Sequence, residues 1–177
     1  MYIWIGINVD DQLSGIKEKA AKIDREAEFK NSCFTLPLHI SLKISFPAES
    51  ADFQSVIDDI TDYYRSIKPF EISVKGFEKD RNIVWIRMVN NREIDKIHDD
   101  LNEMLLSKYK VGLHEYDLDY KFHTTLFMDD DEDKISKAYE LIRDVRLPKS
   151  LNINRFLIGI SDSGNLGTYS IYREIKV

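Results

Sequence analysis

The segment Pro37–Leu42 reads PLHISL, a histidine followed two positions later by a hydroxyl residue. In a β-strand, successive side chains point to opposite faces. His39 and Ser41 would therefore share one face, and Ile40 and Leu42 would lie behind them. One such motif is weak support for a catalytic site, because most strand histidines are structural or lie at the surface.

A second segment, Lys121–Leu126, reads KFHTTL and has the same arrangement. His123 and Thr125 would share a face of their own strand. Two imidazoles and two hydroxyls that face a common space are suited to catalysis on a phosphate group. The pair therefore makes a stronger case than either motif alone.

The chain around the motifs predicts alternating strands and helices. Alternating apolar residues indicate strands, and apolar residues at helical spacing indicate helices. Beside the strand of the second motif, the expected strands are 2–9, 36–46, 70–78, 83–89, 151–161 and 168–177. The expected helices run from about 10 to 29, from 50 or 51 to just before 69, from 91 to 109, and from the acidic run 129–133 to about 145.

The order of these elements repeats halfway along the chain. Each half reads strand, helix, motif strand, helix, strand, and the second half adds a strand that closes a C-terminal hairpin. Trp4 in the sequence IWI matches Trp85 in VWI at an offset of 81 residues, and His39 matches His123 at an offset of 84. A repeat that matches at two places predicts two lobes related by a pseudo-two-fold axis.

We therefore predict an α+β fold with two lobes, each with an antiparallel sheet and flanking helices, around a central cleft. No Pro/Gly/Ser-rich linker separates the halves. We expect residues 1–177 to form one bilobal domain, with repeats of about 1–80 and 81–177.

The composition limits the partners and the compartment. The formal net charge of −6 argues against binding of extended nucleic acid, but it allows a nucleotide or a short RNA end in a local basic cleft. The single cysteine, Cys33, fits a reducing compartment and is expected to be a small core residue. With neither a signal-peptide core nor a membrane-length apolar run, we expect a cytoplasmic protein that does not bind membranes and is a monomer.

The paired motifs resemble those of the 2H phosphoesterase superfamily, which includes bacterial 2′-5′ RNA ligase-like proteins and cyclic phosphodiesterases. Their order and separation cover nearly the whole chain, as does the closing strand that begins with Gly167–Tyr169. The resemblance implies a bilobal fold whose motifs face each other, and action on 2′,3′-cyclic phosphates, 2′-5′ linkages or RNA 3′ ends without metal or other cofactor. Ser41 departs from the commoner threonine but keeps the hydroxyl.

Opening a cyclic phosphodiester requires a proton to leave the attacking water and a proton to reach the leaving ribose oxygen. His39 and His123 would perform both transfers, one neutral as base and one protonated as acid. Ser41 and Thr125 would bind the phosphate and stabilise its developing charge. Which histidine is the base is left open.

Two other functions remain open at this point. The same residues could join RNA ends by the reverse reaction, a 2′-5′ ligation. The chain could also be a module that binds nucleotides or RNA ends without turnover. A metal site in the acidic run 129–133 is disfavoured, since the run lacks the glycine and distal glutamate of an EF-hand loop, and acidic residues are common at helix N-termini.

Continuing the alternation places two further side chains on the active faces. Lys43 would share the face of the first motif and bind the phosphate, and Phe127 would share the face of the second and stack on the substrate. A solvated lysine and a core phenylalanine are the alternatives. Trp4 and Trp85 could line the cleft and stack on the substrate, although core packing is the more ordinary role of a tryptophan.

Two histidines lie outside the motifs. His98 is followed by two aspartates in a predicted helix and is expected to be exposed. His114 lies in the loop before the second motif, near the expected cleft, but no role is assigned to it.

Overall fold

The computed structural model describes residues 1–30 and 33–177. The strands are β1 (Tyr2–Asn8), β2 (His39–Pro47), β3 (Phe70–Asp80), β4 (Ile83–Met88), β5 (His123–Met128), β6 (Ser150–Ile153), β7 (Arg155–Ser161) and β8 (Ser170–Lys176). The α-helices are α1 (Ser14–Ala27), α2 (Phe53–Ser66), α3 (Arg92–Tyr109) and α4 (Glu132–Ile142). The short 3₁₀ helices are η1 (Asp11–Leu13) and η2 (Glu115–Asp117).

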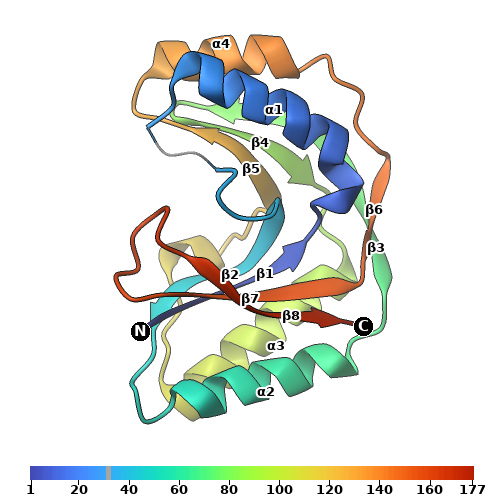
Figure 1. Ribbon diagram of the computed structural model, residues 1–177. Coiled ribbons are helices and arrows are strands. Elements are labelled where there is room, and N and C mark those ends of the chain that lie inside the picture. The colour runs from blue at the N-terminus through green and yellow to red at the C-terminus, as the bar shows by residue number, and fades with distance from the viewer. Residues whose placement is uncertain (31–32) are drawn as a thin grey trace.

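Within these residues the strands form two four-stranded sheets, whose neighbouring strands are antiparallel throughout. The first sheet has the order β2-β1-β7-β8, and the second has the order β5-β4-β3-β6 (Figure 1). Each sheet thus combines strands from both halves of the chain.

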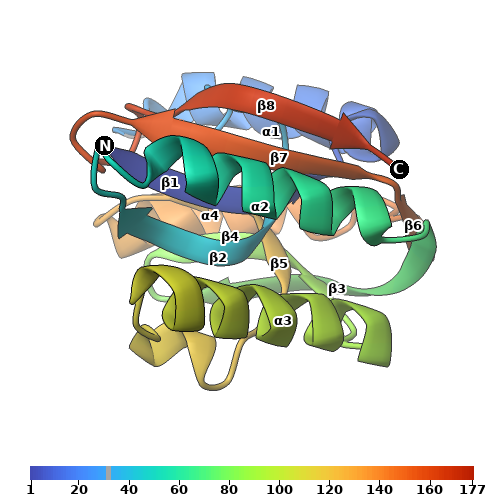
Figure 2. The ribbon, with the colours of Figure 1, turned by 90° about the horizontal axis from the view of Figure 1, so that it is seen from below.

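The helices are exchanged between the sheets as well. Helix α1 packs against α4 and β5 of the second sheet, whereas α3 packs against α2 and β2 of the first sheet. Figures 1 and 2 show α1 and α4 on one lobe, and α2 and α3 on the other. Each lobe is an antiparallel sheet with flanking helices, so the predicted bilobal α+β fold is confirmed.

Strand alternation divides each sheet into a helix-covered face and a face toward the other lobe. In β1, Ile3, Ile5 and Ile7 are fully buried in the core, and Trp4 and Gly6 lie on the opposite face. Among the described residues, no helix has both the length and the apolar character that crossing a membrane requires.

The predicted strand 151–161 is wrong, because two strands occupy it. β6 pairs with β3 in the second sheet, Asn154 follows, and β7 then pairs with β1 in the first sheet. The apolar alternation changes phase at this crossing, from Leu151 and Ile153 to Phe156 and Ile158, and this change is the mark of the second strand in the sequence. The predicted hairpin of the last two strands, β7 and β8, is confirmed.

The acidic run before α4 acts as a helix cap. Asp131 accepts hydrogen bonds from the backbone nitrogens of Asp133 and Lys134, at 3.0 and 3.2 Å. Such an N-cap typically stabilises a helix by about 1 kcal/mol, and it confirms the capping interpretation for Asp131. Asp129 is instead buried and accepts hydrogen bonds from the backbone nitrogens of Lys30 and Asp131, at 3.1 and 3.0 Å.

Candidate functional site

The two motif histidines are held in the same way. Nδ1 of His39 lies 2.8 Å from the carbonyl oxygen of Pro37, and Nδ1 of His123 lies 2.5 Å from that of Lys121. A carbonyl oxygen can only accept, so each Nδ1 carries a hydrogen and donates it. In a neutral ring, Nε2 of each histidine is therefore unprotonated and can accept a proton.

The two motif strands meet across the cleft between the lobes. β2 contacts β5, and a cavity of about 440 Å³ is lined by His39, Ser41 and Thr125. His123 is not among the lining residues, but it lies two residues from Thr125 on the same strand, and it is close enough to influence the pKa of His39 electrostatically. The fold thus brings together both hydroxyls and both imidazoles that the motifs predicted.

Both imidazoles are harder to protonate than free histidine. The pKa of His39 is lowered to about 4, chiefly by burial and also by the nearby His123, while the carbonyl of Pro37 and the carboxylate of Asp10 oppose the shift. Burial also lowers the pKa of His123, and the Arg87 guanidinium adds to that effect. Both rings are consequently neutral at pH 7 in the free protein.

A β-bulge interrupts the alternation of β2 just after the first motif. Ser41 pairs with Gly6 of β1, but Lys43 pairs with the next residue back, Ile5, so that Leu42 is the extra residue of the bulge. Residues directly opposite each other in a sheet share a face. Lys43 therefore points to the core face with Ile5 instead of the cleft face with Ser41.

The second motif strand has a bulge at the same place. Thr125 pairs with Trp85 of β4, but Phe127 pairs with Val84, and Leu126 is the extra residue. Phe127 consequently lies on the core face with the buried Val84. The repeat therefore includes the backbone irregularity as well as the motif.

The prediction that Lys43 shares the face of the first motif is wrong. Its side chain is only 1% exposed, it forms an ion pair with the buried Asp117, and its Nζ donates to the carbonyl oxygen of Gly112 at 3.2 Å. Lys43 is thus tied to the loop between α3 and β5. Ile44 lines the cleft cavity in its place.

The prediction that Phe127 shares the face of the second motif is wrong for the same reason. The ring is 1% exposed and stacks on Phe29 of the segment after α1, with the ring centroids 5.3 Å apart. Phe127 is therefore a core residue that joins β5 to this segment. Met128 lines the cavity in its place.

Trp4 contacts both residues of the first motif. Its Nε1 donates to Ser41 Oγ at 2.9 Å, and its ring centroid lies 4.3 Å from that of His39. A Cβ atom on Gly6 or Gly159 would come within 2.5 or 2.7 Å of the indole, so these glycines leave the room it occupies. Because the indole N–H only donates, Ser41 Oγ accepts from it, and the same hydroxyl also hydrogen-bonds with the side chain of Tyr120.

Trp85 contacts the second motif differently. Its ring centroid lies 4.7 Å from that of His123, but its Nε1 lies 3.4 Å from Glu78 Oε2 and donates to it. Trp85 is also directly opposite Thr125, whereas Trp4 is two residues away from the partner of Ser41. The tryptophans therefore occupy different strand positions, although each packs against a motif histidine.

Two residues at the site were not among the predicted ones. Arg87 pairs with His123 across β4 and β5, and its Nη1 donates to the carbonyl oxygen of Phe122 at 3.3 Å. Asp10 accepts a hydrogen bond from the backbone nitrogen of Leu38 at 2.7 Å, just before the first histidine. The phase of Arg87 with Trp85 in β4 is a signal that could have identified it, whereas Asp10 carries no comparable signal.

The predictions for His98 and Cys33 are wrong. His98 is only 5% exposed, and its ring packs against that of Tyr120 with the centroids 4.9 Å apart. The exposed aspartate that follows it lies on another side of α3, so its charge does not indicate the burial of His98. Cys33 is half-buried and lines the cleft cavity, where burial raises the pKa of its thiol to about 12. His114 lines the same cavity and caps η2.

Among the residues that the structure describes, no three His, Cys, Asp or Glu side chains are grouped so that they could hold a metal ion. The acidic run before α4 and the two motif histidines are included in that statement.

Comparison with known families agrees with this geometry. The sequence profile of the 2′-5′ RNA ligase superfamily matches residues 11–165 of the chain. The chain belongs to the 2′-5′ RNA ligase superfamily. No curated protein matches the sequence of this superfamily member.

Solved structures match over nearly the whole length of this superfamily member. TT0787 of Thermus thermophilus has a TM-score of 0.68 at 15% identity, over 99% of this chain and 97% of that chain. LigT of E. coli, complexed with 3′-AMP, has a TM-score of 0.60 at 13% identity, over 99% and 96%. Usb1 of Kluyveromyces marxianus has a TM-score of 0.53 at 12% identity, over 99% and 98%. These likenesses establish the two-lobed fold.

Proposed function

We propose that this protein is a metal-independent phosphodiesterase that opens 2′,3′-cyclic phosphates or cleaves related 2′-5′ and RNA-end phosphodiester bonds. The observation that carries the proposal is the matched pair of imidazoles, each with Nδ1 fixed on a backbone carbonyl and Nε2 left to exchange a proton. Binding alone would need hydrogen-bond donors, but it would not need two groups that titrate.

In the proposed reaction, a water oxygen attacks the phosphorus as the bond from phosphorus to one ribose oxygen breaks. The neutral histidine takes the proton of the water, and the protonated histidine gives a proton to the leaving ribose oxygen. The product is a nucleoside monophosphate with a free hydroxyl. Each proton transfer typically contributes about 10²–10⁴-fold in rate.

The two hydroxyls would serve the non-bridging phosphate oxygens. Ser41 accepts from the indole of Trp4 through a lone pair, and its own hydrogen would turn from the side chain of Tyr120 to the phosphate when substrate binds. Thr125 lines the same cavity from the other lobe. A donor already fixed in place lowers the cost of stabilising charge in the transition state.

A nucleotide substrate is supported by a structural relative. LigT of E. coli has been crystallised with 3′-AMP, with ATP and with NADP⁺. The net charge of −6 favours a small or short substrate over extended nucleic acid.

The test is a panel of 2′,3′-cyclic nucleotides, 2′-5′ dinucleotides and 3′-tailed RNAs, assayed in excess EDTA with product positions assigned. His39→Gln and His123→Gln keep an N–H donor of similar size but cannot titrate. Each variant should lose at least about 10²-fold in kcat, with an unchanged circular dichroism spectrum. Full activity in either variant, or activity that EDTA abolishes, would contradict the mechanism.

A second candidate function is 2′-5′ RNA ligation, which is supported by the match to the 2′-5′ RNA ligase superfamily. A 5′-hydroxyl can take the place of the attacking water: its oxygen would bond to the phosphorus of a 2′,3′-cyclic phosphate end as the bond to the 3′ oxygen breaks, which leaves a 2′-5′ bond, with the same two histidines moving the protons. Incubation of such RNA ends at high concentration should then yield a 2′-5′ linked product that depends on both histidines. Tight binding without any product in either direction would favour a non-catalytic binding module.

A further inference from the structure

Part of the cleft cavity is built as an uncharged space. Beside His39 and the motif hydroxyls, its walls include Leu38, Ile44 and Met128. Among the described residues that line it, none carries a carboxylate, an ammonium or a guanidinium group. Such walls suit a flat, neutral group attached to the reacting phosphate, and they do not suit a second phosphate.

An aromatic ring stands at the mouth of this cavity. Tyr116 of η2 lines the cavity although its side chain is 65% exposed, and it packs against the ring of His114 with the centroids 4.9 Å apart. Leu166, in the turn between β7 and β8, lines the same cavity and is 64% exposed. Large apolar groups left exposed beside a cavity often mark a binding surface.

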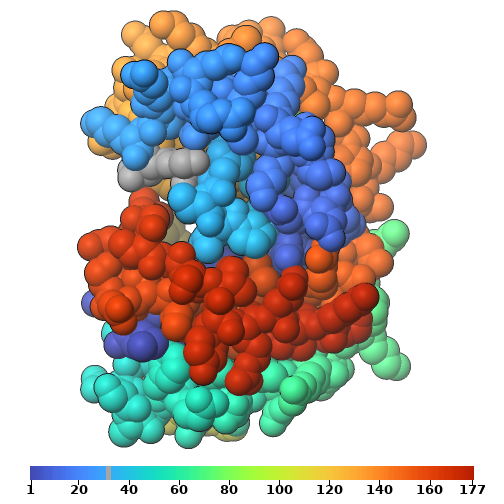
Figure 3. All heavy atoms as spheres, viewed as in Figure 1, coloured from blue at the N-terminus to red at the C-terminus, as the bar shows by residue number. Residues whose placement is uncertain are grey.

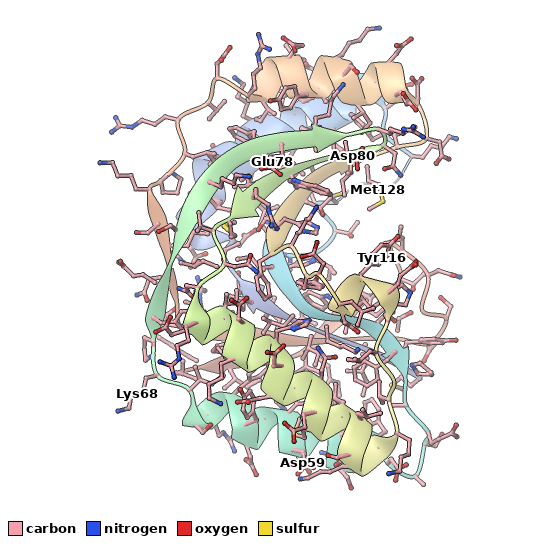
Figure 4. All side chains as sticks on the ribbon, turned by 180° about the vertical axis from the view of Figure 1, so that it is seen from behind. Asp59, Lys68, Glu78, Asp80, Tyr116 and Met128 are labelled. Carbon is pink, nitrogen blue, oxygen red and sulfur yellow. The ribbon has the colours of Figure 1, made fainter. Side chains whose placement is uncertain are left out.

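The opposite wall comes from the other lobe. Met128 of β5 lines the cavity, and Figure 4 shows Met128 and Tyr116 facing each other from the two lobes across the opening. The turn that carries Leu166 projects from the β7–β8 end of the first sheet, below the segment that leads into β2 (Figure 3). A flat group could therefore be enclosed between an aromatic ring and a methionine side chain.

The loop that carries Tyr116 is anchored before any ligand arrives. Asp117 is 8% exposed, forms the ion pair with Lys43, and accepts a hydrogen bond from the backbone nitrogen of His114 at 2.7 Å. The ion pair fixes η2 to β2 of the first sheet, and the hydrogen bond ties the start of η2 to its end. An aromatic ring held in place in this way loses little conformational entropy on binding.

We propose that the space between Tyr116, Leu166 and Met128 is a subsite for the nucleobase of the nucleotide whose phosphate lies between the two motifs. This inference rests on the proposed function and adds which end of the substrate lies where: the base lies at the mouth, beside His39. A cavity of about 440 Å³ is within the range of small-ligand sites and can hold more than a phosphate group.

The experiment compares two substrates with the same reacting group. One is adenosine 2′,3′-cyclic phosphate, and the other is methyl riboside 2,3-cyclic phosphate, in which a methoxy group replaces the base. The wild-type protein should show a kcat/KM at least about tenfold higher for the nucleotide, which is the order that one base–aromatic stack contributes. Equal values for the two substrates would overturn the subsite while leaving the phosphodiesterase proposal standing.

Variants then locate the subsite. Tyr116→Ala should lower kcat/KM for the nucleotide about tenfold without changing it for the methyl riboside, and Tyr116→Phe should restore it because stacking needs no hydroxyl. Leu118→Ala is the matched control, since Leu118 is 75% exposed in the same loop but does not line the cavity. An equal loss on both substrates in Tyr116→Ala would contradict the proposal.

Failure of the proposed function can be told apart from failure of the subsite. If neither substrate is cleaved, the phosphodiesterase proposal fails, and the subsite is tested by equilibrium binding of adenosine 3′-monophosphate and of ribose 3-phosphate. Tighter binding of the nucleotide that is lost in Tyr116→Ala would support the subsite. Equal binding of the two probes would overturn it.

Discussion

At the scale of single residues, the proposed chemistry belongs to the Nε2 atoms of His39 and His123. Their Nδ1 atoms are committed to backbone carbonyls, so a substrate can meet each ring only through its other nitrogen. Burial lowers the pKa of both rings. Protonation of one of these rings, which the proposed reaction requires, therefore costs more free energy than protonation of a free histidine.

This has a consequence for the pH profile. The form with one protonated and one neutral imidazole is lost as the pH rises above the lowered pKa values, so kcat/KM should peak below pH 6.5, the ordinary pKa of histidine. A bound phosphate anion favours the imidazolium, so the profile of kcat should lie at higher pH. Steady-state rates from pH 4 to 9 measure both profiles.

Arg87 provides a variant of the same measurement. Its guanidinium lowers the pKa of His123, so Arg87→Gln should move the high-pH limb of kcat/KM upward. Arg65→Gln is a control, since Arg65 pairs with Asp62 on an exposed face of α2. An Arg87→Gln profile that coincides with the wild-type profile would contradict this electrostatic role.

Trp4 should act on catalysis through Ser41. Trp4→Phe keeps a ring against His39 but removes the hydrogen bond to Ser41, and the loss of one such bond should lower kcat about fivefold. Ser41→Ala should then cost less in the Trp4→Phe background than alone, because the two residues act as a unit. Trp85→Phe is the control, because the indole of Trp85 donates to Glu78. The effects of Trp85→Phe and Ser41→Ala on kcat, expressed as free energies, should therefore be additive.

At the scale of elements, the two bulges separate what the sequence could predict from what it could not. The shared face of His39 with Ser41, and of His123 with Thr125, was predictable, because alternation holds over the three residues from each histidine to its hydroxyl. Beyond that point an extra residue in each strand, Leu42 or Leu126, reverses the faces, and β2 has a further register shift between its pairings with Ile5 and Ile3. A bulge leaves no mark in an apolar alternation such as ISLKI. The prediction for Lys43 therefore assumed regular alternation, which ends at the bulge.

The stability of Lys43 variants distinguishes the two registers. Lys43→Met keeps the length of the side chain but leaves Asp117 buried without its partner, which typically costs about 3–5 kcal/mol. Urea unfolding should show this loss, with KM unchanged for methyl riboside 2,3-cyclic phosphate, which has no base to contact the Tyr116 loop that the ion pair anchors. Lys75→Met removes an exposed ion pair with Glu78 and should cost less than about 1 kcal/mol. A raised KM with unchanged stability would instead support the prediction that Lys43 binds the phosphate.

At the scale of the whole molecule, the exchange of elements joins the two halves of the chain. Each sheet takes strands from both halves, and each pair of helices does the same. The repeat of strands and helices was predictable from the sequence. Their distribution between the lobes was not, because it depends on contacts between segments more than 100 residues apart, such as those of β1 with β7.

This exchange predicts a single cooperative unfolding transition, as expected for one bilobal domain. Trp4 lies in the first sheet and Trp85 in the second, so Trp85→Phe and Trp4→Phe each leave one fluorophore that reports on one lobe. Each variant's urea transition by fluorescence should coincide with its own transition by far-ultraviolet circular dichroism. If the fluorescence midpoint lies below the circular dichroism midpoint in one variant and above it in the other, the two lobes unfold separately.

The paired bulges also change how such a site should be compared between proteins and redesigned. In each motif strand, the fourth residue after the histidine is part of the folding core, and the fifth lines the cleft cavity: Ile44 in one strand and Met128 in the other. A combinatorial library for altered selectivity belongs at these two fifth positions. Randomising the fourth positions, Lys43 and Phe127, would mostly produce proteins that fail to fold.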